Sequence, residues 1–279
     1  MRASTKRWGV LAALSVLASA CSGGSADASE PESSALAADA TGAWSSVGSG
    51  ISLRTMGDGA VTFVAMGGHG TTADHVHAWS EALVRAKLGD LGVGRVIAVA
   101  GPNVVTSAGT NLALPALGAE LRRAKGAIVV AAHSSGSHVA HAVLNALASD
   151  DDGRAVLART SYVNLDGAGS GLGASTKRAL AQTRLVYATD RVAGSSANAD
   201  SMRAHGSDTD STGKAYGIVV DGSGCRPAAQ WCMHDALITT RPHDPAAADV
   251  ARDYVDFEAG RVVQTAWIDA LAPKAWRAP

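Results

Sequence analysis

The sequence is poor in aromatic residues, in net charge and in nucleotide-binding fingerprints. Phenylalanine, tryptophan and tyrosine make up 4% of the 279 residues, which argues against a broad aromatic binding face. The formal net charge is −1, so there is no strong basic field to attract nucleic acid. Glycine-rich phosphate-binding patterns are missing at the strand–helix junctions, and no cofactor is implied. With 47% hydrophobic and 18% charged residues, the composition suits a packed globular core.

The first twenty residues have the pattern of a secretory signal peptide. Basic residues at positions 2, 6 and 7 precede an apolar stretch, 8–18, that is too short to span a bilayer. The small residues Ala18-Ser19-Ala20 then form a cleavage site. We therefore expect residues 1–20 to be removed and the mature chain to be exported to the cell envelope or beyond it.

The residue directly after this cleavage site is Cys21, which resembles the lipidated cysteine of bacterial lipoproteins. Lipidation would tether the protein to a membrane, and ordinary secretion is the alternative. Residues 21–50 consist mainly of Ser, Ala, Gly, Asp and Glu, which predicts a flexible tether. The folded domain is then expected at residues 51–279, as a monomer.

The other two cysteines, Cys225 and Cys232, lie close together in the sequence. In an oxidising compartment they would pair as a local disulfide. Metal ligation is the alternative, but one isolated C-x6-C is a poor zinc signature. Two histidine pairs also lack further ligands, so no metal site is expected: His75 with His77, and His138 with His141.

Short runs rich in Val, Ile and Ala alternate with helical patterns from about residue 60 onward. Strands are predicted at 60–66, 94–100, 126–132, 161–165, 183–188 and 215–220. Helices are predicted around 76–84, 114–125, 135–148 and 246–272. Apolar runs of this kind are typical of parallel strands buried on both faces. The pattern therefore predicts an α/β fold with a mostly parallel central sheet flanked by helices.

The strongest functional signal is Ala132-His133-Ser134-Ser135-Gly136, between the most apolar strand and a helix. Small residues two positions before and after Ser134 would allow a tight turn that lifts its hydroxyl clear of the sheet. The helix N-terminus would favour developing negative charge. The stretch resembles the nucleophile elbow of the α/β-hydrolase superfamily, with Ala132 where glycine is commonest. The alternative is that Ser134 only caps the helix.

The resemblance implies a serine hydrolase whose acid and then histidine follow the nucleophile along the chain. His234, after the last predicted strand, is the favoured base, and His243 is the alternative. Asp190 is the favoured acid because it follows the strand after which the superfamily usually places its carboxylate. Asp166, one strand earlier, is the alternative. The carboxylate would orient the imidazole and stabilise the imidazolium.

The oxyanion donors would be the backbone amide of Ser135 and amides of the loop Gly68-His69-Gly70. Only about seventeen residues separate the strand that ends at Leu165 from the next one, so the lid should be minimal and the site open. This favours small accessible esters or ester-bearing polymers as substrates. A non-catalytic envelope lipoprotein that binds a ligand is the alternative, as is an acyltransferase or peptidase with the same triad.

Overall fold

The computed structural model describes residues 42–104, 106–167 and 171–186, together with Ile238, Ile268 and Leu271. Seven strands lie in these ranges: β1 (Ser45–Gly48), β2 (Ile51–Gly57), β3 (Val61–Met66), β4 (Val93–Ala100), β5 (Ile128–His133), β6 (Thr160–Leu165) and β7 (Gln182–Val186). The α-helices are α2 (Ala73–Leu83), α3 (Leu114–Arg123), α4 (Gly136–Leu147), α5 (Asp151–Leu157) and α6 (Ala174–Ala179). A π-helical turn, η1 (Val84–Leu88), continues α2, and a 3-10 turn, η2 (Thr110–Ala113), leads into α3.

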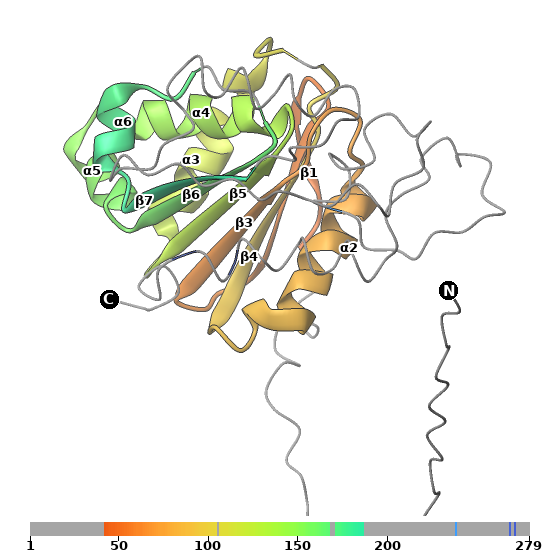
Figure 1. Cartoon of the computed structure of the whole chain (residues 1–279). Coiled ribbons are helices and arrows are strands. Elements are labelled where there is room, and N and C mark those ends of the chain that lie inside the picture. The colour runs from red at the N-terminus through yellow and green to blue at the C-terminus, as the bar shows by residue number, and fades with distance from the viewer. Residues whose placement is uncertain are drawn as a thin grey trace, which may run out of the picture. The chain divides into compact units, whose positions relative to one another are not determined.

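All seven strands belong to one sheet, in the order β1-β2-β4-β3-β5-β6-β7 (Figure 1). The strands from β3 to β7 run parallel, whereas β2 is antiparallel to β4 and to β1. The α/β class and the mostly parallel sheet predicted from the sequence are therefore confirmed. The predicted strands within the described residues agree with β3 to β7 to within two residues at each end. The predicted strand at 215–220 lies outside the described residues.

The hairpin of β1 and β2 was not predicted from the sequence. β1 begins at Ser45, inside the stretch assigned to the tether, and pairs Ser45 with Leu53. The predicted domain boundary at residue 50 is therefore wrong, and the folded part begins earlier. β2 alternates buried and partly exposed residues from Ile51 to Arg54, as expected for a strand near the sheet edge. Its mixed composition hides that alternation in the sequence.

Helices cover both faces of the sheet, and each face has its own apolar cluster (Figure 1). On one face α2 and η1 pack over β3 and β4, and Ile238, Ile268 and Leu271 join this cluster. On the other face α3, α4 and α5 pack over the same strands and over β5 and β6. With helices on both faces, β3, β5 and β6 are buried along their whole length, and most of their residues are apolar. No helix in the described ranges is long and apolar enough to cross a membrane.

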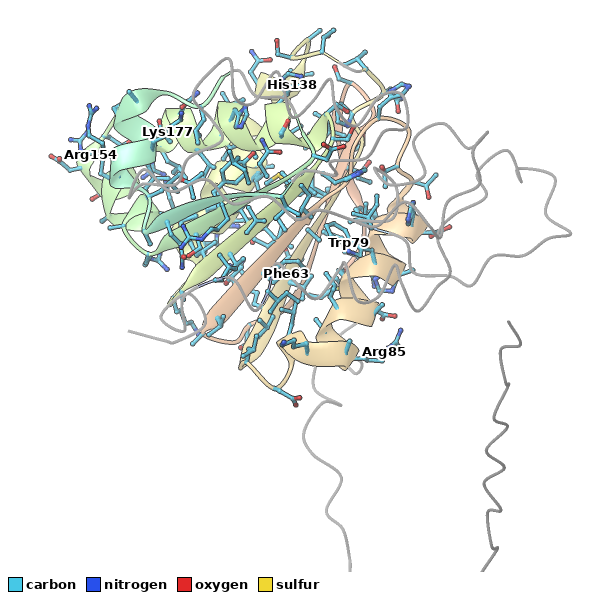
Figure 2. All side chains as sticks on the ribbon, in the orientation of Figure 1. Phe63, Trp79, Arg85, His138, Arg154 and Lys177 are labelled. Carbon is cyan, nitrogen blue, oxygen red and sulfur yellow. The ribbon has the colours of Figure 1, made fainter. Side chains whose placement is uncertain are left out.

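Trp79 is the largest fully buried side chain on the α2 face, where it meets Phe63 edge to face with ring centroids 6.4 Å apart (Figure 2). We expect Trp79→Ala to lower the free energy of unfolding by about 3–5 kcal/mol, because it leaves a large cavity. Trp79→Phe should cost less than about 1.5 kcal/mol, since the buried Nε1 donates no hydrogen bond within the described residues.

Urea titration followed by circular dichroism measures these changes. Leu112→Ala is the control, because Leu112 is 47% exposed and its truncation should change stability by less than about 0.5 kcal/mol. Equal losses for Trp79→Ala and Leu112→Ala would contradict the assignment of Trp79 to the core.

Candidate active site

Ser134 lies in the tight turn between β5 and α4, as the sequence predicted. Its φ angle is 54°, in the left-handed region that residues other than glycine seldom adopt. The Ser134 amide donates to the Leu165 carbonyl at 3.0 Å, and the Ser134 carbonyl accepts from the Ser137 amide at 3.0 Å. Ser134 is half-buried, whereas its neighbours His133 and Ser135 are buried. The turn is thus fixed by backbone hydrogen bonds in a strained conformation, which is a frequent property of functional sites.

The glycine two residues after Ser134 is required by close backbone contacts. A β-carbon on Gly136 would lie 2.5 Å from the carbonyl oxygen of Gly67, closer than real β-carbons approach any atom. Ala132 pairs with Met66 on one side and with Asn164 on the other, in the middle of the sheet. Because the obstructing atoms belong to the backbone of Met66 and Gly67, at the end of β3 and just after it, they cannot rotate away. Position 136 therefore needs glycine.

The loop that follows β3 lies against Ser134. A β-carbon on Gly68 would be 2.6 Å from Ser134 Cβ and 3.2 Å from Ser134 Oγ. Gly68 is buried, while His69 and Gly70 are exposed. The glycine-rich stretch predicted as the oxyanion loop is therefore adjacent to Ser134, the predicted nucleophile. Any side chain at position 68 would overlap Ser134.

The amides of this loop divide into two groups. Gly67 donates to Val99 O at 2.9 Å, and Gly70 donates to Pro102 O at 3.3 Å, so both stabilise the loop itself. Within the described residues, the amides of Gly68, His69 and Ser135 donate no hydrogen bond to another residue. Of the four predicted donors, Ser135, Gly68 and His69 therefore have an N–H available for a ligand, and the Gly70 N–H is occupied.

Asp166 directly follows β6, at the same edge of the sheet as Ser134. It has no exposed surface, and its φ angle is 47°, again in the left-handed region. Its amide donates to Val186 O, which joins the turn to β7. His133 and Leu165 are partners in the β5–β6 register, so Ser134 and Asp166 are the next residues along two adjacent strands. The structure thus brings the alternative acid next to the elbow.

Several predicted residues lie outside the described part of the chain. They are the acid Asp190, the bases His234 and His243, the disulfide pair Cys225 and Cys232, and the lipidation site Cys21. One described contact involves a residue close in sequence to His234, the favoured base. His75 Nε2, in the first turn of α2, donates to the carbonyl of Ile238 at 3.2 Å. Ile238, four residues after His234, is therefore held beside the helix that begins after the glycine loop.

Polar residues on β6 and on α4 hold the chain that leaves β6, and the sequence did not single them out for this role. Asn164 Oδ1 accepts from the Gly167 amide at 2.9 Å. Asn145 Oδ1 accepts from the Gly173 amide at 2.9 Å, and Asn145 Nδ2 donates to Gly171 O. The sequence signal is an amide side chain within a strand or helix that is mostly buried.

His141, the second histidine of the pair on α4, contacts Tyr162 of β6. A hydrogen bond of 3.0 Å joins His141 Nε2 and the Tyr162 hydroxyl. Burial raises the pKa of Tyr162 well above its usual range, so the hydroxyl keeps its proton. His138 lies one turn earlier, on the part of α4 nearest the elbow (Figure 2). No group of three possible metal ligands occurs among the residues that the structure describes.

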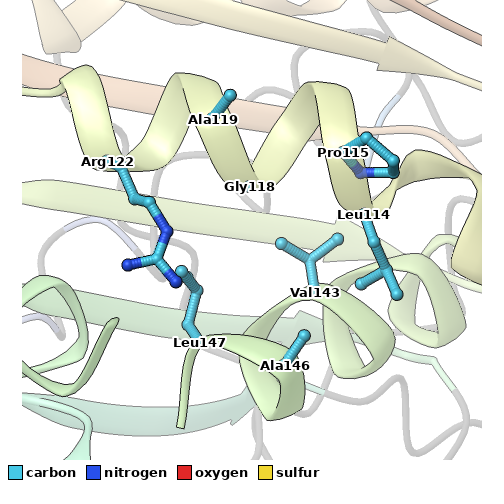
Figure 3. Close-up of a pocket in the computed structure, with 8 residues that line it drawn as sticks. All are labelled: Leu114, Pro115, Gly118, Ala119, Arg122, Val143, Ala146 and Leu147. Carbon is cyan, nitrogen blue, oxygen red and sulfur yellow. The ribbon is translucent and has the colours of Figure 1, made fainter. Parts of the chain in front are cut away.

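A groove of about 290 Å³ lies between α3 and α4, away from the elbow (Figure 3). Its lining is apolar apart from one arginine: Leu114, Pro115, Gly118, Ala119, Arg122, Val143, Ala146 and Leu147. The α4 residues in this set begin nine positions after Ser134, which corresponds to about 14 Å along a helix. The groove is therefore separate from the candidate active site.

No protein family model matches the chain, and no curated protein is similar to it. The fold and the candidate site nevertheless share one recognisable arrangement. A serine in a strained strand–helix turn, two sets of unoccupied amides and a buried carboxylate meet at the carboxyl edge of a mostly parallel sheet. Such an edge is where open α/β sheets bind ligands.

The two glycines at 136 and 118 offer a matched test of the elbow geometry. Gly136→Ala should destabilise the fold by about 1–3 kcal/mol or more, because its β-carbon would overlap the Gly67 backbone. Gly118→Ala lies in α3 with nothing within 4 Å of the new β-carbon, and should stabilise by about 0.5–1 kcal/mol. Denaturant unfolding of the two variants measures both effects. Unchanged stability of Gly136→Ala would contradict the close contact.

Proposed function

We propose that the protein is an exported serine hydrolase with the α/β-hydrolase fold, which cleaves carboxylic esters through an acyl-enzyme on Ser134. One observation carries the proposal: Ser134 adopts φ 54° between β5 and α4, with Gly68 of the β3–α2 loop packed against it. In α/β-hydrolases the nucleophile occupies such a strand–helix turn. Their oxyanion hole combines the next amide with one from the loop after the third strand.

The described groups support a two-step mechanism. The Ser134 hydroxyl adds to the ester carbonyl carbon while a histidine accepts its proton. The amides of Ser135 and of Gly68 or His69 stabilise the oxyanion, and the N-terminus of α4 adds a favourable dipole. The carbon–oxygen bond to the alcohol then breaks, and the imidazolium returns the proton to the leaving oxygen. Water, activated by the same histidine, hydrolyses the acyl-enzyme and restores Ser134.

His234 is the base in this proposal. Ile238 is held beside the first turn of α2 by His75, and four residues of chain span at most about 14 Å. That turn is close to the oxyanion loop, because a β-carbon on Gly67 would lie 2.8 Å from Val76 Cγ2. Four residues of chain are therefore long enough to connect Ile238, beside α2, with a base at the site. His243, five residues after Ile238, is the alternative base.

The carboxylate is proposed to be Asp190 or Asp166. The usual strand order of the superfamily supports Asp190, which follows β7. Burial and position beside the elbow support Asp166. Either residue would hold the imidazole in the required tautomer and stabilise its protonated form during attack.

Export through residues 1–20, lipidation of Cys21 and a Cys225–Cys232 disulfide are part of the same proposal. The disulfide would restrain the segment that contains His234 two residues later. The connection from β6 to α6 is short, since α6 begins at Ala174, which supports an open site with a minimal lid. The proposed substrates are accordingly short esters or esters on envelope polymers.

Replacement of the nucleophile is the first test of the mechanism. Ser134→Ala should reduce hydrolysis of p-nitrophenyl acetate by about 10⁴-fold or more, because the acyl-enzyme can no longer form. Ser149→Ala is the matched control and should keep wild-type kcat, because Ser149 is exposed after the end of α4. Steady-state kinetics with both purified variants measure the difference. Activity retained by Ser134→Ala would exclude the serine mechanism.

The chain length of the acyl group tests the open site. With p-nitrophenyl esters, kcat/KM should be highest for acetate and butyrate, and palmitate should show no jump in rate at its solubility limit. The reason is that a short β6–α6 connection leaves no large apolar lid to bury a long chain. Strong preference for palmitate with activation at the lipid interface would contradict this prediction.

A further inference from the structure

Asn164 places an amide side chain with no exposed surface at the carboxyl end of β6. It pairs in register with Ala132 of β5 and with Leu185 of β7, in the central part of the sheet. A buried amide is costly unless it makes hydrogen bonds. Asn164 Oδ1 accepts from the Gly167 amide at 2.9 Å, three residues along the chain. The side chain therefore stabilises the turn that carries Asp166.

This turn fixes the backbone on both sides of Asp166. The Asp166 amide donates to Val186 O, and the following amide donates to Asn164. Between these two bonds Asp166 adopts φ 47°, a conformation that aspartate tolerates better than most residues. Without the second bond, the extended conformation would be the preferred one for Asp166. Asn164 thus holds the residue in a specific orientation.

The turn at Asp166 and Gly167 packs directly against the strand–helix turn at Ser134. A β-carbon on Gly167 would lie 2.4 Å from Asn164 Oδ1, 2.6 Å from Ser137 Cβ and 2.7 Å from the Ser134 carbonyl oxygen. Ser134 and Asp166 follow adjacent parallel strands, which are spaced by about 4.8 Å. A change in the backbone conformation at Asp166 would therefore alter the contacts that Gly167 makes with Ser134 and Ser137.

Asp166 differs from every other acidic residue in the described part of the chain, because it alone is buried. A buried carboxylate is destabilising unless charged or polar groups compensate it, and such groups concentrate at functional sites. Surface carboxylates such as Asp150 serve as helix caps or in exposed ion pairs instead. Asp166 is thus the one carboxylate in the described ranges that the fold takes fully out of solvent.

We infer that Asn164 is a positioning residue that holds Asp166 beside Ser134, and that Asp166 is the carboxylate of the reaction. This inference rests on the proposed serine hydrolase function and chooses between its two acids. Asn164 acts through Asp166, because its Oδ1 accepts the amide that directly follows this residue. Removal of its amide should lower the rate of chemistry, and should do so only while the carboxylate is present.

The other end of the β6–α6 connection offers a matched control. Asn145 Oδ1 accepts from the Gly173 amide at 2.9 Å and from Thr176 Oγ1 at 2.7 Å, and its Nδ2 donates to Gly171 O. These bonds anchor the start of α6 and do not touch Asp166. Asn145→Ala should therefore lower the thermal unfolding midpoint while kcat stays within about twofold of wild type.

The test is a double-mutant cycle with Asn164→Ala, Asp166→Asn and the combined variant, assayed with p-nitrophenyl acetate well below the unfolding midpoint. We expect Asn164→Ala to lower kcat on the order of 10- to 100-fold with KM nearly unchanged. Asp166→Asn should lower kcat on the order of 10²- to 10⁴-fold. The combined variant should be no slower than Asp166→Asn alone. Asn164→Ser should recover part of the loss, because a hydroxyl accepts the same bond more weakly.

Each other outcome has a definite meaning. Multiplicative losses in the cycle, or an equal loss of kcat in Asn145→Ala, would overturn the positioning role of Asn164. Wild-type kcat in Asp166→Asn together with its loss in Asp190→Asn would overturn Asp166 as the acid and leave the hydrolase proposal intact. Absence of any Ser134-dependent hydrolysis in the wild-type protein would instead refute the proposed function itself. If Asn164→Ala does not fold, Asn164→Ser in the same cycle decides the question.

Discussion

Three backbone segments meet around Ser134 at distances that leave no room for a β-carbon. Gly68 from the loop after β3, Gly136 from the start of α4 and Gly167 from the turn after β6 each approach a neighbouring atom so closely that a side chain would overlap it. In two of these contacts the obstructing atom is a carbonyl oxygen of the backbone, which cannot rotate away. The left-handed conformation of Ser134 is possible only because these segments hold the turn from three sides.

The rest of the fold supplies the rigidity that this convergence needs. β3, β5 and β6 are buried on both faces, so the segments that leave them begin from fixed points. α2 and the α3–α5 group seal the two faces, and their apolar clusters are independent of the polar edge. The amides of Gly68, His69 and Ser135, which donate no hydrogen bond within the described residues, lie at that edge. A rigid scaffold with unoccupied donors is the arrangement that stabilises a transient oxyanion without reorganisation.

The sequence predicted those parts of the molecule that depend on local pattern. The apolar runs identified β3 to β7, and the small residues around Ser134 identified the turn, because both signals are confined to a few adjacent positions. The β1–β2 hairpin was missed because its short strands mix polar and apolar residues near the sheet edge. The use of the Gly70 amide by Pro102 could not be read from the sequence, since the partner comes from another loop. The same holds for the position of Asp166 beside Ser134, which depends on the β5–β6 register.

The proposed activation of the Ser134 hydroxyl can be tested directly with a fluorophosphonate probe. The folded full-length protein is incubated with the probe, and the adduct is mapped by peptide mass spectrometry. We expect one phosphonate per chain, on Ser134, and loss of the adduct when the protein is first unfolded in urea. A chain that remains unmodified, or an adduct on the adjacent Ser135 in place of Ser134, would contradict it.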